Sequence, residues 1–120
     1  MSELNLIELS KNFAVAIIAV CKTIKTERDG TVLYSQLLRS GTSIGANIHE
    51  ANYASSRLDF INKFQIALKE CNETLYWLEI FFRAEYLQEK EYQDLYLDCS
   101  KIKKMLSASL ITAKKSITQE

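Results

Sequence analysis

Apolar residues recur at intervals of three and four positions along four long segments of this chain, and no proline interrupts them. This interval is the period of one face of an α-helix. The absence of proline and the small number of glycines argue against a β-sandwich, whose many turns usually need both residues. The sequence therefore predicts an all-α protein.

The four periodic segments predict helices at roughly 4–28, 32–53, 57–84 and 89–117. Asp29-Gly30 is expected to end the first helix, because glycine adopts the left-handed conformation at little cost. Ser56-Arg57-Leu58-Asp59 has the form of a capping box, with aspartate in the third position, at the start of the third helix. Since the connections are short, we expect one domain over 1–120, an antiparallel up-down-up-down four-helix bundle.

Charge and hydropathy restrict where such a bundle could act. The chain has 15 basic and 15 acidic residues, so no net charge draws it onto nucleic acid or an anionic membrane. The apolar run at 13–21 is short for a membrane span. Glu3 and Glu8 precede this run where a secretory signal would carry positive charge, and no small-residue cleavage site follows it. We therefore expect a cytoplasmic protein that contacts no membrane.

The three cysteines, Cys21, Cys71 and Cys99, lie far apart and show no CxxC spacing. In a cytosolic chain they are expected to be reduced, buried thiols. A metal or redox site would need neighbouring cysteine or histidine residues, which the sequence lacks. We expect no cofactor and no metal.

The segment 39–56, RSGTSIGANIHEANYASS, holds two of the three glycines and the only histidine. It matches neither a Walker loop nor a dinucleotide-binding fingerprint. His49-Glu50 lacks the second histidine of an HExxH motif, and nothing positions a nucleophile beside His49. We therefore expect no catalytic residues, no enzymatic activity and no small-molecule substrate.

The same segment favours a role in packing. Gly41 and Gly45 lie four residues apart on one helix face, which would let another backbone approach closely. A polar stripe lies beside the apolar face and consists of Ser40, Ser43, Asn47 and Glu50. This stripe is either a hydrogen-bonded seam that fixes the register of the helices or a recognition surface, and its spacing favours the seam.

The segment 75–82, LYWLEIFF, is too apolar for a helix of an isolated bundle. A surface helix of a monomer should show a polar face opposite its apolar stripe. We predict that Tyr76, Trp77 and Phe81 cover a neighbouring copy as well as the core, so that the protein is a homo-oligomer. The alternative is a wide core face with one exposed aromatic residue.

Charge is distributed unevenly along the fourth predicted helix, which begins acidic and turns basic at Lys101. This order complements the helix dipole. In an up-down bundle, the end of the fourth helix also lies near the start of the third. We therefore predict a basic pole that binds nucleic acid and becomes a multivalent rim in a symmetric oligomer. Its residues are Arg57, Lys63, Lys104, Lys114 and Lys115.

The stretch 43–50, SIGANIHE, resembles the S-I-x-x-N-I-x-E signature of a bacterial four-helix-bundle family encoded in intervening sequences of 23S rRNA genes. The accessory variability determinant of diversity-generating retroelements is a relative of that family. The similarity continues through Ser56, Phe60 and 66–75, although many relatives have proline where Gly45 stands. On this resemblance, the signature positions with a structural role are Ser43, Ile44, Asn47, Ile48, Glu50, Phe60, Ala67 and Glu73.

The resemblance implies a ring-shaped homo-pentamer without enzymatic activity. It also implies an association with nucleic acid, because the retroelement relative has a basic surface and acts with a reverse transcriptase. We therefore expect a homo-oligomer that binds RNA or a nucleic-acid-processing partner, such as a ribosomal RNA or reverse transcriptase complex. The alternative is a protein-interaction scaffold with no direct nucleic-acid contact.

Overall fold

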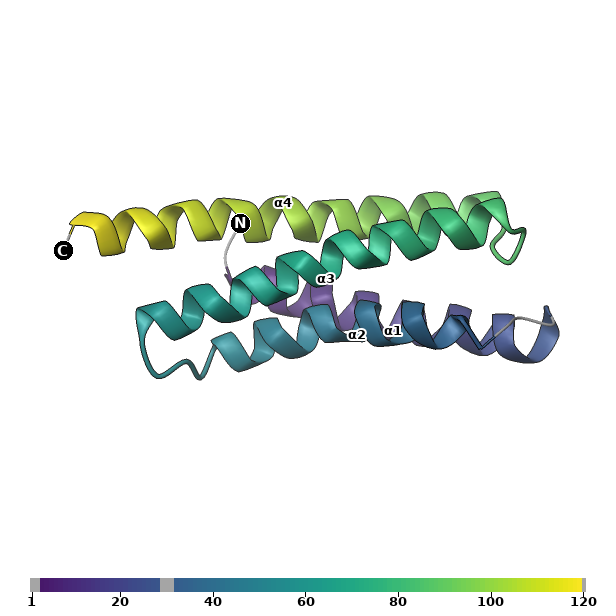
Figure 1. Cartoon of the computed structure of the whole chain (residues 1–120), viewed down its shortest axis with the longest axis horizontal. Coiled ribbons are helices and arrows are strands. Elements are labelled where there is room, and N and C mark those ends of the chain that lie inside the picture. The colour runs from purple at the N-terminus through teal and green to yellow at the C-terminus, as the bar shows by residue number, and fades with distance from the viewer. Residues whose placement is uncertain (1–2, 29–31, 120) are drawn as a thin grey trace.

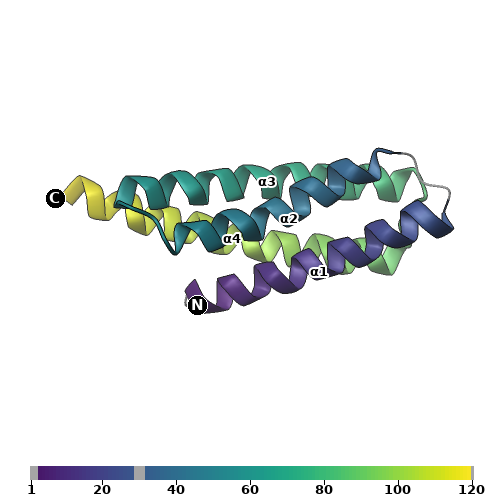
Figure 2. The same ribbon diagram turned by 90° about the horizontal axis from the view of Figure 1, so that it is seen from below.

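A computed structural model describes residues 3–28 and 32–119, which form four helices and, within these ranges, no strand. The helices are α1 (Glu3–Glu27), α2 (Tyr34–Ala51), α3 (Arg57–Arg83) and α4 (Glu89–Gln119). They lie side by side, and successive connections alternate between the two ends of the molecule (Figures 1 and 2). α1 and α3 each pack against α2 and α4. The predicted all-α fold of four helices is confirmed, while Asp29-Gly30 lies outside the described residues.

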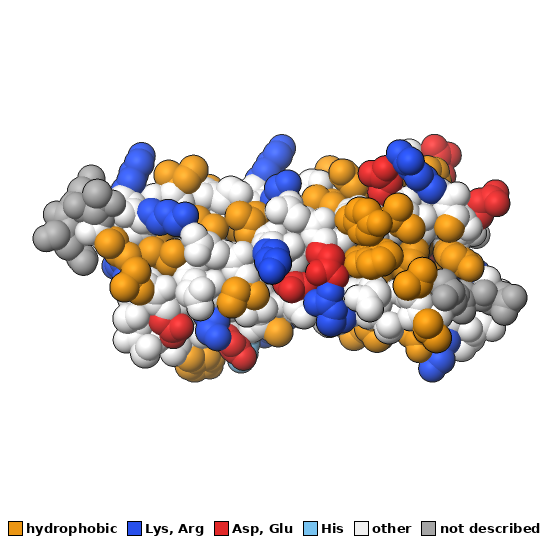
Figure 3. Space-filling model, viewed as in Figure 1, with side chains coloured by type: hydrophobic (Ala, Val, Ile, Leu, Met, Phe, Trp, Pro, Cys, Tyr) orange, Lys and Arg blue, Asp and Glu red, His pale blue; other side chains and the backbone are white. Residues whose placement is uncertain are grey.

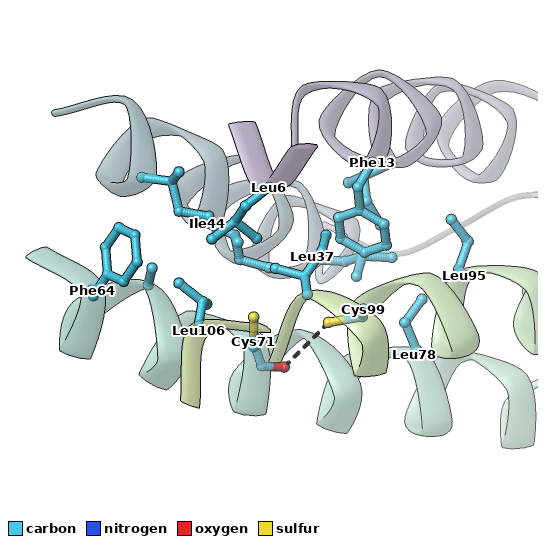
Figure 4. Packing of buried hydrophobic residues seen from close by; sticks show 14 of the residues in the cluster. Leu6, Phe13, Leu37, Ile44, Phe64, Cys71, Leu78, Leu95, Cys99 and Leu106 are labelled. Atoms are coloured by element: carbon cyan, nitrogen blue, oxygen red, sulfur yellow. Dashed lines mark hydrogen bonds between the residues drawn. The ribbon is translucent and has the colours of Figure 1, made fainter. Parts of the chain in front are cut away.

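The predicted apolar stripes meet in one core that runs the length of the bundle (Figure 4). Fully burying a leucine, isoleucine or phenylalanine side chain stabilises a fold by about 1.5–3 kcal/mol. The largest fully buried side chains include Leu6, Ile17, Leu37, Ile44, Phe64, Leu78, Phe81, Ile102 and Leu106. Every helix contributes to this set. Separating any one helix from the bundle would therefore expose buried apolar side chains to water.

The three cysteines are buried in the core as free thiols. The Cys99 thiol donates a hydrogen bond to the carbonyl oxygen of Cys71 over 3.6 Å, between α4 and α3 (Figure 4). Burial raises the pKa of the Cys21 thiol to about 11. Contact with Cys99, together with burial, also raises the pKa of the Cys71 thiol. Because the thiolate is the nucleophilic form, Cys21 and Cys71 are poor nucleophiles at neutral pH.

Both ends of α3 are fixed by local hydrogen bonds. At the start, Ser56 Oγ accepts from the backbone N–H of Asp59 over 3.0 Å, as the predicted capping box requires. The Asp59 carboxylate reaches back to the N–H of Ser55, one residue before the expected partner. At the end, Glu85 takes a positive φ of 67°, and the next N–H, of Tyr86, bonds to the carbonyl of Phe81 over 2.8 Å. This is a Schellman cap with glutamate where glycine is usual.

The two glycines of α2 face α1 and permit the close approach that their spacing predicted. A Cβ added at Gly41 would lie 2.9 Å from side-chain carbons of Ile17. A Cβ added at Gly45 would lie 3.3 Å from the carbonyl oxygen of Ser10. These glycines therefore set the distance between α1 and α2.

The end of α1 is fastened to the start of α4 by Arg28. Its guanidinium makes two hydrogen bonds to the Glu91 carboxylate, over 2.8 and 3.1 Å, and one to the carbonyl oxygen of Tyr86. The Arg28 guanidinium holds the pKa of Glu91 below its usual range, and the N–H of Gln88 acts in the same direction. Glu91 is therefore stabilised in its charged form.

Replacing Glu91 by glutamine should lower the free energy of unfolding at pH 7 by about 1 kcal/mol, because a paired carboxylate is lost. Since the pKa of Glu91 is lower in the folded state, its contribution is complete above the unfolded pKa near 4.5 and is lost as the pH falls through the folded pKa. Urea titrations from pH 7 to pH 3 should show the gap between the two proteins closing below about pH 4. The exposed Asp98→Asn is the control, and an equal gap at every pH would contradict this account.

Candidate nucleic-acid interface

The last two thirds of α4 carry positive charge without any negative charge. Residues 99–119 contain five lysines and no carboxylate, whereas Glu89, Glu91, Asp94 and Asp98 precede them. The face in Figure 3 shows blue side chains along the C-terminal part of α4 and red ones near its N-terminal part, while other red side chains lie below α4 in the middle of the face and toward the turn from α2 to α3. The lysines of the stretch are Lys101, Lys103, Lys104, Lys114 and Lys115.

Arg57 lies beside the C-terminal part of α4. One open cleft is lined both by Arg57, at the first position of α3, and by residues of α4 up to Ala113. Arg57, Lys114 and Lys115 are all exposed. The structure thus brings these three predicted residues to one end of the molecule, and we use the term basic pole for Arg57, Lys114 and Lys115 alone.

The other two residues predicted for the basic pole have different surroundings. Lys63 forms an ion pair with Glu50 of α2, with 3.1 Å between Nζ and Oε2, so a carboxylate neutralises its charge. Lys104 lies ten residues before Lys114, about 15 Å along the helix. It lines a groove between α3 and α4 in the middle of the bundle. Lys104 is thus separated from the other residues along α4, and Lys63 has a carboxylate partner, so both are left out of the basic pole as defined above.

The polar stripe of α2 forms only part of the predicted seam. Ser43 Oγ donates to the carbonyl of Arg39 over 2.7 Å, and Asn47 Nδ2 donates to the carbonyl of Ser43 over 2.9 Å. Both bonds stay within α2. The hydroxyls of Ser40 and Thr74, 3.0 Å apart and buried, hydrogen-bond across to α3. Sequence spacing identified Ser40 but gave no sign of Thr74.

Carboxylates among the signature positions join α2 to α3. Glu50 pairs with Lys63, and Glu73 pairs with Arg39, which also lies 3.2 Å from Glu70. The indole N–H of Trp77 donates to Glu73 over 3.2 Å. The apolar signature side chains Ile44, Ile48 and Ala67 are buried in the core, and Phe60 is half-buried against Phe64. These positions therefore mark the contact between α2 and α3.

Comparison with known proteins agrees with this fold. Residues 2–108 match the family described as 23S rRNA-intervening sequence protein. The chain belongs to this family. It is similar to a protein of unknown function from the S23 ribosomal protein family of Bacteroides thetaiotaomicron VPI-5482, whose crystal structure is known. The two are 46% identical, with a TM-score of 0.89, over 92% of this chain and 98% of that chain. No curated protein matches the chain.

In this member of the 23S rRNA-intervening sequence family, one residue predicted for an oligomer interface must be corrected. Phe81 is only 1% exposed and packs edge-on against Tyr86 within the protomer. Its side chain therefore cannot contact a second copy of the protein. Tyr76 is 57% exposed, and Trp77 is half-buried beside it. The apolar run thus divides between core and surface.

Sequence reasoning missed other exposed apolar residues of this family member. The side chains of Val15 and Ile18 are at least half exposed on the outer face of α1. Those of Leu97 and Ile111 are more than half exposed on α4. Val15 and Ile18 belong to the apolar run 13–21, and the run alone does not show which of its residues face outward, whereas Leu97 and Ile111 are apolar residues next to core positions.

His49 lies on the surface near the end of α2. Its ring is exposed and lies 5.5 Å from the ring of Tyr53. Within 3–28 and 32–119, no group of three or more histidine, cysteine, aspartate or glutamate residues could hold a metal ion. None of the described helices of this intervening-sequence family member is long and apolar enough to cross a membrane.

Proposed function

We propose that the protein is a non-enzymatic homo-oligomer that binds RNA through the basic pole of each protomer. The observation that supports this function is the stretch 99–119 of α4, where five lysines occur without a carboxylate, beside the exposed Arg57. Phosphate groups bind such a surface and release their counterions, which drives association even when the net charge is zero. A nucleic-acid-processing protein is the second kind of partner that this surface would suit.

The proposed oligomer is a ring of antiparallel up-down-up-down bundles, with five copies as the family resemblance implies. Exposed apolar side chains on three helices support self-association, because large exposed apolar patches are uncommon on monomers. These side chains are Val15, Ile18, Tyr76, Leu97 and Ile111. Light scattering from the purified protein should give a mass of about five protomers, and a monomer at micromolar concentration would contradict the ring.

Replacing both Lys114 and Lys115 by glutamine should weaken binding to structured RNA about tenfold at low salt, because up to two phosphate contacts per protomer are lost. The measurement is filter binding or fluorescence anisotropy with a labelled RNA hairpin. The matched control removes the same charge at the opposite end of the molecule, through Lys22→Gln with Lys90→Gln. Equal losses in both double variants would mean that the net charge, and not the basic pole, governs binding.

A protein-interaction scaffold is the second candidate, and the exposed Tyr76 and Leu97 favour it. Such a scaffold would need these apolar surfaces but not the basic pole. Tyr76→Ser with Leu97→Ser would then abolish complex formation with its protein partner, while Lys114→Gln with Lys115→Gln would leave it intact. For the RNA-binding function, Lys114→Gln with Lys115→Gln should instead lower the affinity for RNA.

A further inference from the structure

An open cleft lies at the end of the bundle that carries the basic pole. α1 begins short of this end, whereas α4 continues past it, so the fourth corner of the bundle is missing there (Figures 1 and 2). The cleft lies between the turn from α2 to α3 and residues 108–113 of α4, and its volume is about 660 Å³. This volume falls within the range of about 300–1,000 Å³ that is usual for small-ligand sites.

The cleft has an aromatic wall. Phe60 lines it and is half-buried, so part of the ring remains accessible. The buried Phe64 holds this ring in place, with centroids 4.3 Å apart and an angle of 34° between the ring planes. A fixed, partly accessible ring is the surface on which nucleobases stack in proteins that bind single strands.

Polar groups surround the aromatic wall. Asn52 and Ser109 line the cleft, and neither side chain hydrogen-bonds to another group within 3–28 and 32–119. Arg57 lies at the same cleft, and no carboxylate of these described ranges pairs with it. The nearby Asp59 carboxylate accepts a hydrogen bond from the N–H of Ser55. The cleft thus offers hydrogen-bonding groups for a base edge and one guanidinium for a phosphate.

We propose that this cleft binds one unpaired nucleotide, with its base against Phe60 and its phosphate at Arg57. This inference rests on the proposed RNA-binding function and adds to it. The cleft accepts a base that is extruded from a duplex or lies in a single strand, while Lys114 and Lys115 hold the neighbouring phosphates. An RNA loop or single-stranded end is therefore preferred over a continuous duplex.

The test uses a short uridine-rich RNA with 2-aminopurine at its centre, because stacking on an aromatic ring quenches the fluorescence of this base. Wild-type protein should quench the fluorescence, and a duplex of the same sequence should bind more weakly. Phe60→Leu keeps most of the apolar volume but removes the aromatic face, so its affinity should fall about fivefold to a hundredfold. Phe60→Tyr should retain binding. Phe82→Leu, the same change about 33 Å further along α3, is the matched control and should bind like wild type.

A second variant tests the cleft separately from the aromatic ring. Ser109→Phe adds bulk inside the cleft without changing any charge, and it should abolish the quenching. Ser107→Phe, on the same helix but lining the groove between α3 and α4, should not. Circular dichroism at the assay temperature identifies any variant that has failed to fold, and Ser109→Phe and Phe60→Leu must both be folded to count.

The outcomes separate this inference from the proposed function. Suppose that RNA binds and depends on Lys114 and Lys115, but the base is not quenched and Phe60→Leu binds normally. The nucleotide site is then wrong, and the RNA-binding function stands. If 2-aminopurine riboside monophosphate is quenched at millimolar concentration but RNA does not bind, the cleft holds a free nucleotide and the proposed function is wrong. If neither probe binds at low salt, both are wrong.

Discussion

Replacing Phe81 by alanine is expected to lower the free energy of unfolding by about 3–5 kcal/mol. The ring is 1% exposed and touches Trp77 and Tyr86, with centroids 6.0 Å away in each case. Removing it leaves a cavity at the end of α3, where Phe81 also provides the carbonyl that caps the helix. Chemical denaturation monitored by circular dichroism measures the loss.

The neighbouring Tyr76→Ala is the control, because its side chain is 57% exposed. It should change the unfolding free energy of the protomer by less than about 0.5 kcal/mol. If the protein self-associates through this surface, Tyr76→Ala should instead shift the oligomer toward smaller species in light scattering. A destabilisation by Phe81→Ala as small as that of Tyr76→Ala would show that Phe81 is not a core residue.

Gly41→Ala is expected to lower the free energy of unfolding by about 1–3 kcal/mol, even though alanine favours helices by about 1 kcal/mol over glycine. The added methyl group would lie 2.9 Å from carbons of Ile17, whose side chain is fully buried and stiff because it branches at Cβ. Neither group can move without shifting α1 away from α2. Denaturant unfolding of the purified variant measures the change.

A second substitution identifies the cause. Ile17→Ala removes both γ carbons that the added methyl group would meet, and alone should cost about 2–5 kcal/mol. Combined with Gly41→Ala it should cost less than the sum of the two single changes, because the crowding is relieved. Ile24→Ala makes the same change on a buried residue of α1 that an added Cβ at Gly41 does not meet, so its effect should simply add. Additivity in both pairs would exclude a clash between Gly41 and Ile17.

Local signals made the helices predictable. The apolar period placed all four, and the start of α3 at Arg57 followed from the capping residue Ser56. α2 is shorter than predicted by two residues at each end, since the period of apolar residues does not define where the last turn ends. The spacing of Gly41 and Gly45 alone predicted the close approach of another helix, because the helical repeat places both glycines on one face.

Contacts between residues that are far apart in the chain could not be predicted from the sequence. Arg28 and Glu91 are 63 positions apart, and nothing local indicates that they meet. The pairing of Lys63 with Glu50 removed one residue from the predicted basic pole for the same reason. The apolar run around Phe81 showed too much apolar surface for one stripe, but helical period alone does not say which aromatic residue faces the core. The cleft beside Phe60 depends on where α1 starts relative to the end of α4, which no motif encodes.

The most direct test of the account is the salt dependence of RNA binding by the wild-type protein. If Arg57, Lys114 and Lys115 contact phosphates, the logarithm of the affinity should fall linearly with the logarithm of the salt concentration, with a slope of about −2 for each protomer engaged on single-stranded RNA. A titration from 50 to 300 mM KCl with a labelled single-stranded RNA measures this slope. A slope near zero, or no binding at the lowest salt concentration, would contradict the proposal that this bundle binds RNA through its basic pole.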